Sequence, residues 1–420
     1  MTKLEVFLDL KKEKPKFIET NNPFGMSNFK RRDFLKLSSL SALPLLAPAI
    51  PFQAIASTPQ RFSKDSEAVY FINDGIFYRP EDLIAKLQEI NSTNPIERDS
   101  YAEGGTIDKL LKKFIAITGK EAAVYLPSGT LANQLAISVL CGQNTKAFVQ
   151  ETSHVYRDEG DAAQTLFNKR LIPLAKERAY FTLEELQQSI AYHKQGEYFV
   201  GGVGAVSIET PVRRCEGQLF PLEEIKRISA YCKEQGYKMH LDGARLHMAT
   251  AFTNSTVKEY ASYFDTVYLC LYKYLGATGG AVLCGDKALI NQMHHLIKIH
   301  GGGVFTNWPS AAIALHHLNT IDEDMQQIKA KAKELFVLLN NLKGIKVNAL
   351  TNGTNLFNVS LDKGIDAEKL NKRLRTEHNI VFGMPKEDGQ VKIKINLTLL
   401  RRSNQLIFES FKEALAFAKA

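Results

Sequence analysis

The stretch VYLCLYKYLGATGG, residues 267–280, decides how this chain of 420 residues folds and where its chemistry lies. Its apolar part belongs to a run, Asp265–Leu271, that is typical of a buried strand. The run leads directly into Lys273, which is flanked by tyrosines and followed by a glycine-rich turn. Lysine is seldom buried without a partner or a function. Because an amine held where it can lose its proton is suited to Schiff-base chemistry, we predict that Lys273 is catalytic.

A second apolar segment ends on a carboxylate 31 residues before that lysine. We expect Lys238–Leu241 to be a strand, and Asp242 follows it directly. Ligands in open α/β sheets bind beyond the carboxyl ends of the strands, which places Asp242 at a site. Taken alone, an aspartate in this position is more often a helix N-cap than a catalytic group.

A third motif, PSGTLANQ at residues 127–134, joins an expected strand (122–126) to an expected helix that starts near Leu131. The free N–H groups and the positive end of the dipole of such a helix form an anion site. Gly129 lets a phosphate approach the backbone. The motif alone is equally compatible with a capped helix start that holds no ligand.

The segments around these motifs alternate between strand-like and helix-period patterns from about residue 105, which predicts an α/β fold. Beyond residue 325 the pattern reads as a separate α+β domain of ordinary size. We therefore divide the chain into an N-terminal signal segment (1–56), an N-terminal arm with a large domain (57–325) and a small C-terminal domain (326–420).

Composition argues against several classes of function. The formal net charge of +8 divides equally between residues 1–56 and the remainder, where basic and acidic side chains are interspersed. There is no nucleic-acid-binding signature, so we expect no nucleic-acid partner. The five cysteines are odd in number and widely spaced, so we predict neither a disulfide framework nor a metal site.

The N-terminal segment has the form of a twin-arginine export signal. The sequence FKRRDFLK at residues 29–36 precedes an uncharged apolar run, Leu37–Ile50, and then Ala54-Ile55-Ala56, a small-x-small cleavage pattern. The run of 14 residues is shorter than the roughly 20 that span a bilayer. We predict export to the periplasm or cell envelope without a stable membrane anchor, and translation from Met26.

Taken together and in this order, the motifs resemble the threonine aldolase and β-eliminating lyase family of fold-type-I pyridoxal-phosphate (PLP) enzymes. The resemblance covers roughly residues 70–420 and is most specific at DGARL, residues 242–246. It implies a large PLP-binding domain with a mostly parallel sheet and a smaller α+β C-terminal domain. It also implies pyridoxal 5'-phosphate as the cofactor, a small amino acid as the substrate, and a homodimer or homotetramer with shared active sites.

The resemblance assigns cofactor roles to named residues. Lys273 would form the Schiff base, and Asp242 would pair with the pyridine nitrogen. Ser128, Gly129 and Thr130 would hold the phosphate.

Three further residues take roles near the ring and the substrate. His154 matches the histidine that stacks on the ring and serves as a base, although a lone histidine after a strand is usually structural. Arg245 would lie beside the ring and bind the substrate carboxylate. Lys298 would approach the site from the partner subunit.

Departures from the family pattern lie on the substrate side. Val212 replaces a histidine thought to handle the substrate hydroxyl, and Asn73 replaces a serine that helps to hold the carboxylate. Lys392 replaces an arginine, and these two side chains are not equivalent. Arg213, which the family pattern lacks, is a substitute anion contact or an ordinary surface residue.

These observations predict a PLP-dependent lyase, with aldol cleavage of a β-hydroxy-α-amino acid to glycine and an aldehyde as the leading reaction. A β-eliminating lyase or an aminotransferase is the near alternative, and a non-catalytic binding protein on the same scaffold is the alternative from another class. The apolar Val212 predicts a preference for phenylserine over threonine.

Overall fold

A computed structural model describes residues 67–199, 201–385 and 390–419. The expected signal segment, including Met26 and the apolar run Leu37–Ile50, lies outside these residues. Among the described residues, no helix is long and apolar enough to cross a membrane.

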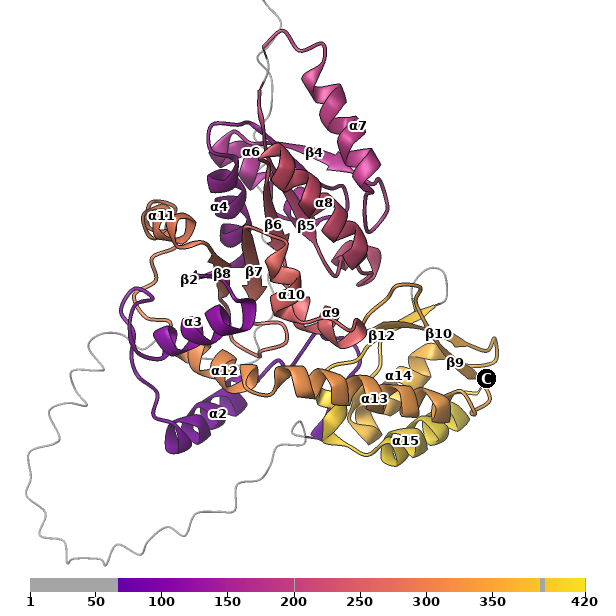
Figure 1. Ribbon diagram of the computed structural model, residues 1–420. Coiled ribbons are helices and arrows are strands. Elements are labelled where there is room, and N and C mark those ends of the chain that lie inside the picture. The colour runs from indigo at the N-terminus through magenta and orange to yellow at the C-terminus, as the bar shows by residue number, and fades with distance from the viewer. Residues whose placement is uncertain (1–66, 200, 386–389, 420) are drawn as a thin grey trace, which may run out of the picture. The chain divides into compact units, whose positions relative to one another are not determined.

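The central feature is a seven-stranded sheet in the order β2-β8-β7-β6-β5-β3-β4 (Figure 1). All its strand pairs are parallel except the two that involve β8. The strands are β2 (Ala122–Leu126), β3 (Lys146–Gln150), β4 (Arg170–Leu174), β5 (Val203–Glu209), β6 (Lys238–Asp242), β7 (Thr266–Cys270) and β8 (Ala281–Gly285). The predicted α/β fold with a mostly parallel sheet is confirmed.

Both faces of this sheet are covered by helices. Along β7, Val267 packs into one apolar cluster with α3 and α8, whereas Tyr268 packs into another with α4 and α11. Successive strand residues point to opposite faces, so these clusters are the two layers of the core. The helices up to residue 318 are α2 (Pro80–Thr93), α3 (Gly105–Thr118), α4 (Gly129–Cys141), α5 (His154–Arg157), α6 (Ala162–Phe167), α7 (Leu183–Lys194), α8 (Leu222–Gln235), α9 (Leu246–Phe252), α10 (Val257–Ser262), α11 (Lys287–Ile299) and α12 (Trp308–Leu318).

The C-terminal part forms a second, smaller sheet. Its strands β9 (Ile345–Ala349), β10 (Leu356–Leu361) and β12 (Val391–Lys394) pair antiparallel in the order β12-β10-β9. Two helices of this part, α14 (Ala367–His378) and α15 (Asn404–Phe417), pack against each other. Strand β12 ends at Lys394, and a 3-10 turn, η3 (Leu397–Arg401), begins three residues later.

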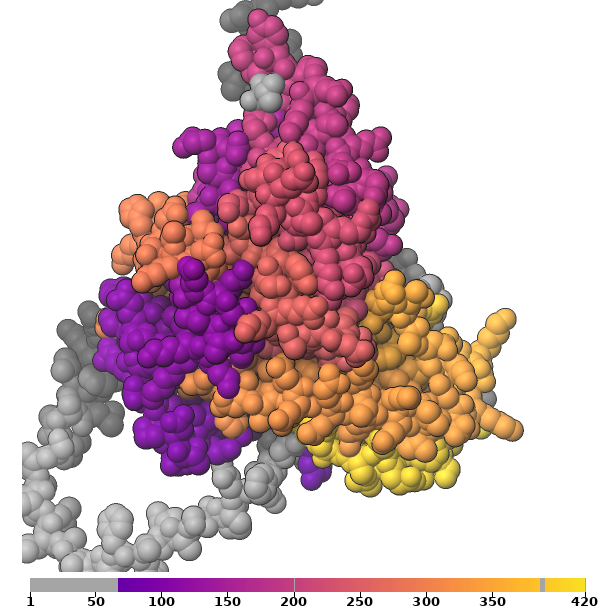
Figure 2. Space-filling model, viewed as in Figure 1, coloured from indigo at the N-terminus to yellow at the C-terminus, as the bar shows by residue number. Residues whose placement is uncertain are grey.

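Two connections join the parts. The long helix α13 (Ile321–Leu339) contacts α9 on one side and α15 on the other, and Figure 2 shows its side chains in a band with those of α12. The short strand β1 (Val69–Tyr70) pairs in parallel with β11 (Ile380–Val381). The predicted division at residue 325 falls inside α13, which continues to Leu339.

Candidate active site

A cavity lies at the carboxyl ends of β5 and β6, where the sequence predicted a site. Glu209 and Asp242 are the last residues of these two strands, and both are buried. The lining residues come from the carboxyl ends of β2, β3, β5, β6 and β7 and from the segments that follow these strands. They are Pro127, Ser128, Gly129, Thr130, His154, Glu159, Glu209, Asp242, Ala244, Arg245, Tyr268, Tyr272 and Lys273.

The N-terminus of α4 forms one wall of this cavity. The side chain of Ser128 caps the helix by accepting a hydrogen bond from the backbone N–H of Leu131 at 3.2 Å. A Cβ atom at Gly129 would lie 2.1 Å from the hydroxyl of Tyr268, so only glycine fits there. The first-turn N–H groups, the positive end of the helix dipole and a tyrosine hydroxyl thus gather at one point, which suits a phosphate.

Asp242 lines the same cavity and is held in place by two hydrogen bonds. Its Oδ2 accepts from the side-chain amide of Asn133 at 2.8 Å, and its Oδ1 accepts from the backbone N–H of Ala244 at 3.1 Å. A carboxylate fixed in this way can pair with a protonated ring nitrogen without reorganising.

Lys273 follows β7 and lines the same cavity. Its Nζ lies 5.6 Å from the centroid of the Tyr272 ring. The segment around Gly75 packs against its backbone so closely that a Cβ at Gly75 would lie 1.8 Å from the carbonyl oxygen of Lys273. The backbone of Lys273 is therefore fixed by close packing against the Gly75 segment while the residue lines the cavity.

Two buried acids surround His154. Its Nδ1 lies 2.8 Å from Oε1 of Glu159, and this hydrogen bond raises the pKa of His154. Burial raises the pKa of Glu159 as well. Glu209 accepts backbone N–H bonds from His154 at 2.6 Å and from Arg213 at 2.9 Å. Burial and the nearby Asp242 raise the pKa of Glu209 to about 7.

Arg245 lines the cavity, and its guanidinium group forms an ion pair with Asp74. Its Nη2 donates to Oδ2 of Asp74 at 2.7 Å, and Lys394 donates to the other oxygen of Asp74 at 2.9 Å. Burial alone would raise the pKa of Asp74, but the two cations hold it well below its ordinary value. Asp74 thus fixes two cations side by side, and the triad keeps one net positive charge.

Four residues predicted to bind substrate do not line this cavity. The backbone carbonyl of Asn73 accepts a hydrogen bond from the side chain of Asn396 at 2.9 Å. The side chain of Lys392 forms an ion pair with Glu216. An acidic partner therefore already compensates the charge of Lys392.

The other two predicted residues are Arg213 and Lys298. Arg213 lies at the surface and pairs with Asp158 at 2.5 Å. Lys298 lies in a separate cavity, where its Nζ is 4.5 Å from the centroid of the Tyr101 ring. Val212 is fully buried and absent from the lining of the Lys273 cavity, so the sequence argument that it faces the substrate is not supported.

Five residues at or behind the site were not predicted. These are Asp74, Asn133, Glu159, Glu209 and Lys394. Glu209 ends a buried strand next to Asp242, so the strand-end rule that found Asp242 could have found it too.

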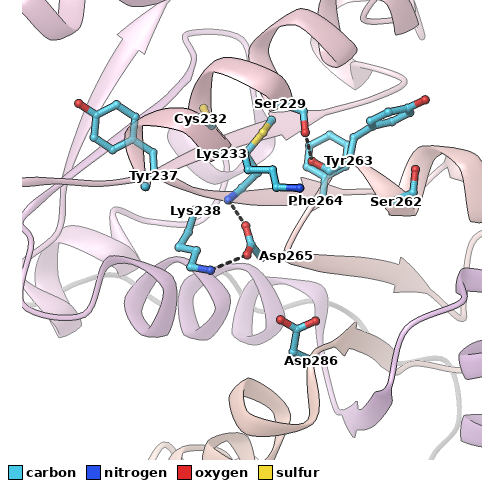
Figure 3. A pocket seen from close by; sticks show the side chains of 12 residues that line it. Ser229, Cys232, Lys233, Tyr237, Lys238, Ser262, Tyr263, Phe264, Asp265 and Asp286 are labelled. Atoms are coloured by element: carbon cyan, nitrogen blue, oxygen red, sulfur yellow. Dashed lines mark hydrogen bonds and ion pairs between the residues drawn. The ribbon is translucent and has the colours of Figure 1, made fainter.

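A larger cavity, of about 330 Å³, lies at the opposite edge of the sheet (Figure 3). Asp265 in its lining accepts one hydrogen bond from the side chain of Lys238 at 2.9 Å and one from the backbone N–H of Met239 at 2.7 Å. It contains none of the predicted site residues, and it lies at the amino ends of β6 and β7, where α/β sheets seldom bind ligands.

The first cavity fits PLP. It offers an amine for the aldehyde on Lys273, a fixed carboxylate for the pyridine nitrogen on Asp242, and a helix N-terminus for the phosphate. One carboxylate oxygen there, Oε2 of Glu159, is buried without a hydrogen-bond partner in the described protein. A buried polar atom in this state is expected to meet a ligand or a proton.

Comparison with known proteins agrees with this geometry. The sequence model of the family described as beta-eliminating lyase matches residues 85–362. A low-specificity L-threonine aldolase of Candida albicans is 32% identical over 285 residues, which are 67% of this chain and 74% of that protein. Low-specificity L-threonine aldolase 1 of Arabidopsis thaliana is 26% identical over 341 residues, 80% of this chain and 94% of that one.

Solved structures share the fold. The structure of Leishmania major threonine aldolase superposes with a TM-score of 0.63 at 17% identity, covering 82% of this chain and 98% of that one. An alanine–glyoxylate aminotransferase from Nostoc sp. gives a TM-score of 0.59 at 15% identity, with 83% and 95% covered. With the family match over 278 positions, residues 85–362, these likenesses show that the chain belongs to the β-eliminating lyase family of fold-type-I PLP-dependent enzymes.

Proposed function

We propose that this protein is a PLP-dependent carbon–carbon lyase that cleaves a β-hydroxy-α-amino acid into glycine and an aldehyde. The observation that carries the proposal is the single cavity in which Lys273, Asp242, His154 and the N-terminus of α4 converge. The names of its relatives as low-specificity L-threonine aldolases support the same reaction.

Each residue of the cavity has a distinct role in the proposed reaction. PLP, when bound, supplies an electron sink for the charge that develops at Cα of the substrate. The carboxylate of Asp242 favours a proton on the pyridine nitrogen and so strengthens that sink. The α4 N-terminus holds the phosphate, and His154 accepts the proton of the substrate hydroxyl at its second ring nitrogen.

We propose that the substrate carboxylate binds at Arg245, which lines the cavity, and at Lys394, which shares Asp74 with Arg245 although it is not among the lining residues. Asp74 holds both cations, and their triad keeps a net charge of +1 that a carboxylate can neutralise. The resemblance would assign this role to Lys392, but Glu216 pairs with that lysine.

Replacing Lys394 with alanine is therefore expected to raise KM for the amino acid about tenfold to a hundredfold, because a charge-assisted hydrogen bond contributes about 1.5–3 kcal/mol. Lys392→Ala, two residues earlier on the same face of β12, should have the smaller effect. Steady-state kinetics of the two variants measures this ranking. A larger rise of KM in Lys392→Ala than in Lys394→Ala would mean that Lys392, and not Lys394, binds the substrate carboxylate.

Product analysis tests the reaction. The PLP-loaded protein, incubated with threonine, allo-threonine and phenylserine, is expected to release glycine and the matching aldehyde in equal amounts. A keto acid would instead indicate elimination or transamination. Absence of turnover with every β-hydroxy amino acid would favour a binding protein on this scaffold.

We also propose a homo-oligomer in which Lys298 serves a partner's site. Lys298 and Tyr101 line a cavity of their own with Glu103 and Gly303, apart from the Lys273 cavity of the same chain. The PLP enzymes that this chain resembles build their sites at subunit interfaces, which supports this arrangement.

Export by the twin-arginine route is a further part of the proposal, based on the arginine pair at 31–32 and the apolar run that follows. Arg31→Lys with Arg32→Lys keeps the charge but removes the pair, so precursor should accumulate in the cytoplasm. Immunoblots of periplasmic and cytoplasmic fractions measure this. Export of the double variant at the wild-type level would point to another route.

A further inference from the structure

A continuous hydrogen-bond network runs behind the cavity from one histidine to another. The side-chain amide nitrogen of Asn133 donates to Oε1 of Glu159 and to Oδ2 of Asp242, both at 2.8 Å. The amide oxygen of Asn133 lies 3.0 Å from Nε2 of His240, and Oε1 of Glu159 lies 2.8 Å from Nδ1 of His154.

The direction of each bond in this network follows from the chemistry of its members. Asn133 Oδ1 can only accept, so His240 must carry its proton on Nε2 and accept from Thr266 at Nδ1. Burial lowers the pKa of His240 to about 4, which keeps it neutral and in this one tautomer. Both N–H groups of Asn133 therefore point at the carboxylates.

The same reasoning fixes the tautomer of His154. Oε1 of Glu159 accepts from Asn133, and it accepts from Nδ1–H of His154 whether or not Oε2 of Glu159 holds a proton. In neutral His154, the nitrogen that can take up a proton is therefore Nε2.

We propose that Glu159 is the positioning residue of His154. Asn133 hydrogen-bonds both Glu159 and Asp242, so that the proton-accepting Nε2 of His154 and the carboxylate that pairs with the cofactor ring are held in a fixed relative position. Glu159 does not touch the reacting atoms and acts through His154. The orientation of His154 stands on the geometry alone, while its role as a base rests on the proposed function.

Charged groups from several elements face His154. Glu159 lies five residues after His154, Glu209 comes from β5 and Asp242 from β6. The cations Arg245 and Lys273 line the same cavity. The side chain of His154 is 32% exposed and that of Glu159 only 1%. Among the three acids, the hydrogen bond to Glu159 contributes most to the raised pKa of His154.

The test that does not depend on activity is a histidine titration of the cofactor-free protein. The protein is labelled with 13C at histidine Cε1, and His154→Asn identifies the signal of His154. In wild type this signal should titrate above the ordinary pKa of histidine, and in Glu159→Gln the pKa should fall. Asp161→Asn, which removes an exposed carboxylate two residues further on, should leave it unchanged.

Either of two outcomes would overturn the proposal: a wild-type His154 that titrates at or below the ordinary value, or a pKa that Glu159→Gln leaves in place. A wild-type His154 that titrates at or below the ordinary value overturns the proposal even if Glu159→Gln does not fold.

Kinetics of the loaded enzyme then separates positioning from a merely structural role. A base works in its neutral form, so the acid limb of the pH profile of kcat/KM should move to lower pH in Glu159→Gln. The rate constant kcat should fall about tenfold to a hundredfold with KM nearly unchanged, and Glu159→Asp should recover part of it. A loss of rate at every pH without movement of the limb would mean that Glu159 acts only through stability. Absence of turnover in wild type would refute the proposed function and leave the titration result standing.

Discussion

Replacing Lys273 with alanine is expected to reduce kcat/KM by at least about a thousandfold and to remove covalently held PLP. Under the proposed function its amine both attaches the cofactor and carries protons in the cavity that it lines, and a positioned proton carrier alone contributes about 10²–10⁴-fold. The visible absorbance of the purified variant, compared with wild type, measures the loss of covalent binding. Aldehyde release measures the loss of activity.

Another lysine provides the control for this variant. Lys287 begins α11 and is exposed, so Lys287→Ala should keep the colour and the rate of wild type. Retention of both by Lys273→Ala would contradict the assignment of this lysine.

The second large effect is expected for Asp242→Asn. Asparagine keeps the size of the side chain but removes the charge that, under the proposed function, stabilises a protonated pyridine nitrogen. Two unit charges about 4 Å apart interact by about 4 kcal/mol at an effective dielectric constant of about 20. This energy corresponds to roughly a thousandfold in rate, so kcat should fall by about that factor. Steady-state kinetics measures the fall.

Asp265→Asn is the matched control for this prediction. Asp265 also borders a cavity of the same sheet, but at the amino ends of the strands, where it pairs with Lys238 (Figure 3). The Asp265→Asn substitution should leave kcat within about threefold of wild type. Equal losses in the two variants would mean that loss of stability, rather than the charge at Asp242, accounts for the effect.

The sequence predicted much of the fold because its signals are local. The fully buried strands β3, β5 and β7 appear as short, mostly apolar runs, as expected in a mostly parallel sheet that is covered on both faces. The turn at Ser128–Gly129 was visible because a capping side chain and a glycine at a close contact are both local requirements.

The presence of Asp242 and Lys273 at one cavity could be predicted for the same reason, since Asp242 ends β6 and Lys273 lies three residues after β7. The substrate side could not, because its arrangement depends on pairs that are distant in sequence. Lys394 meets Asp74 across 320 positions, and no local pattern distinguishes it from Lys392. Glu159 contacts His154 only five positions away, but its link to Asp242 runs through Asn133, 26 positions away, and no local pattern shows that link.

The central claim is that Lys273 carries PLP, and identifying the lysine that binds PLP covalently tests it most directly. Purified wild-type protein is loaded with PLP, reduced with borohydride and digested, and the modified peptide is identified by mass spectrometry. The account predicts one reduced pyridoxyl adduct, on Lys273 in the sequence LYKYLGA at residues 271–277. An adduct on a different lysine, or no bound PLP at all, would contradict it.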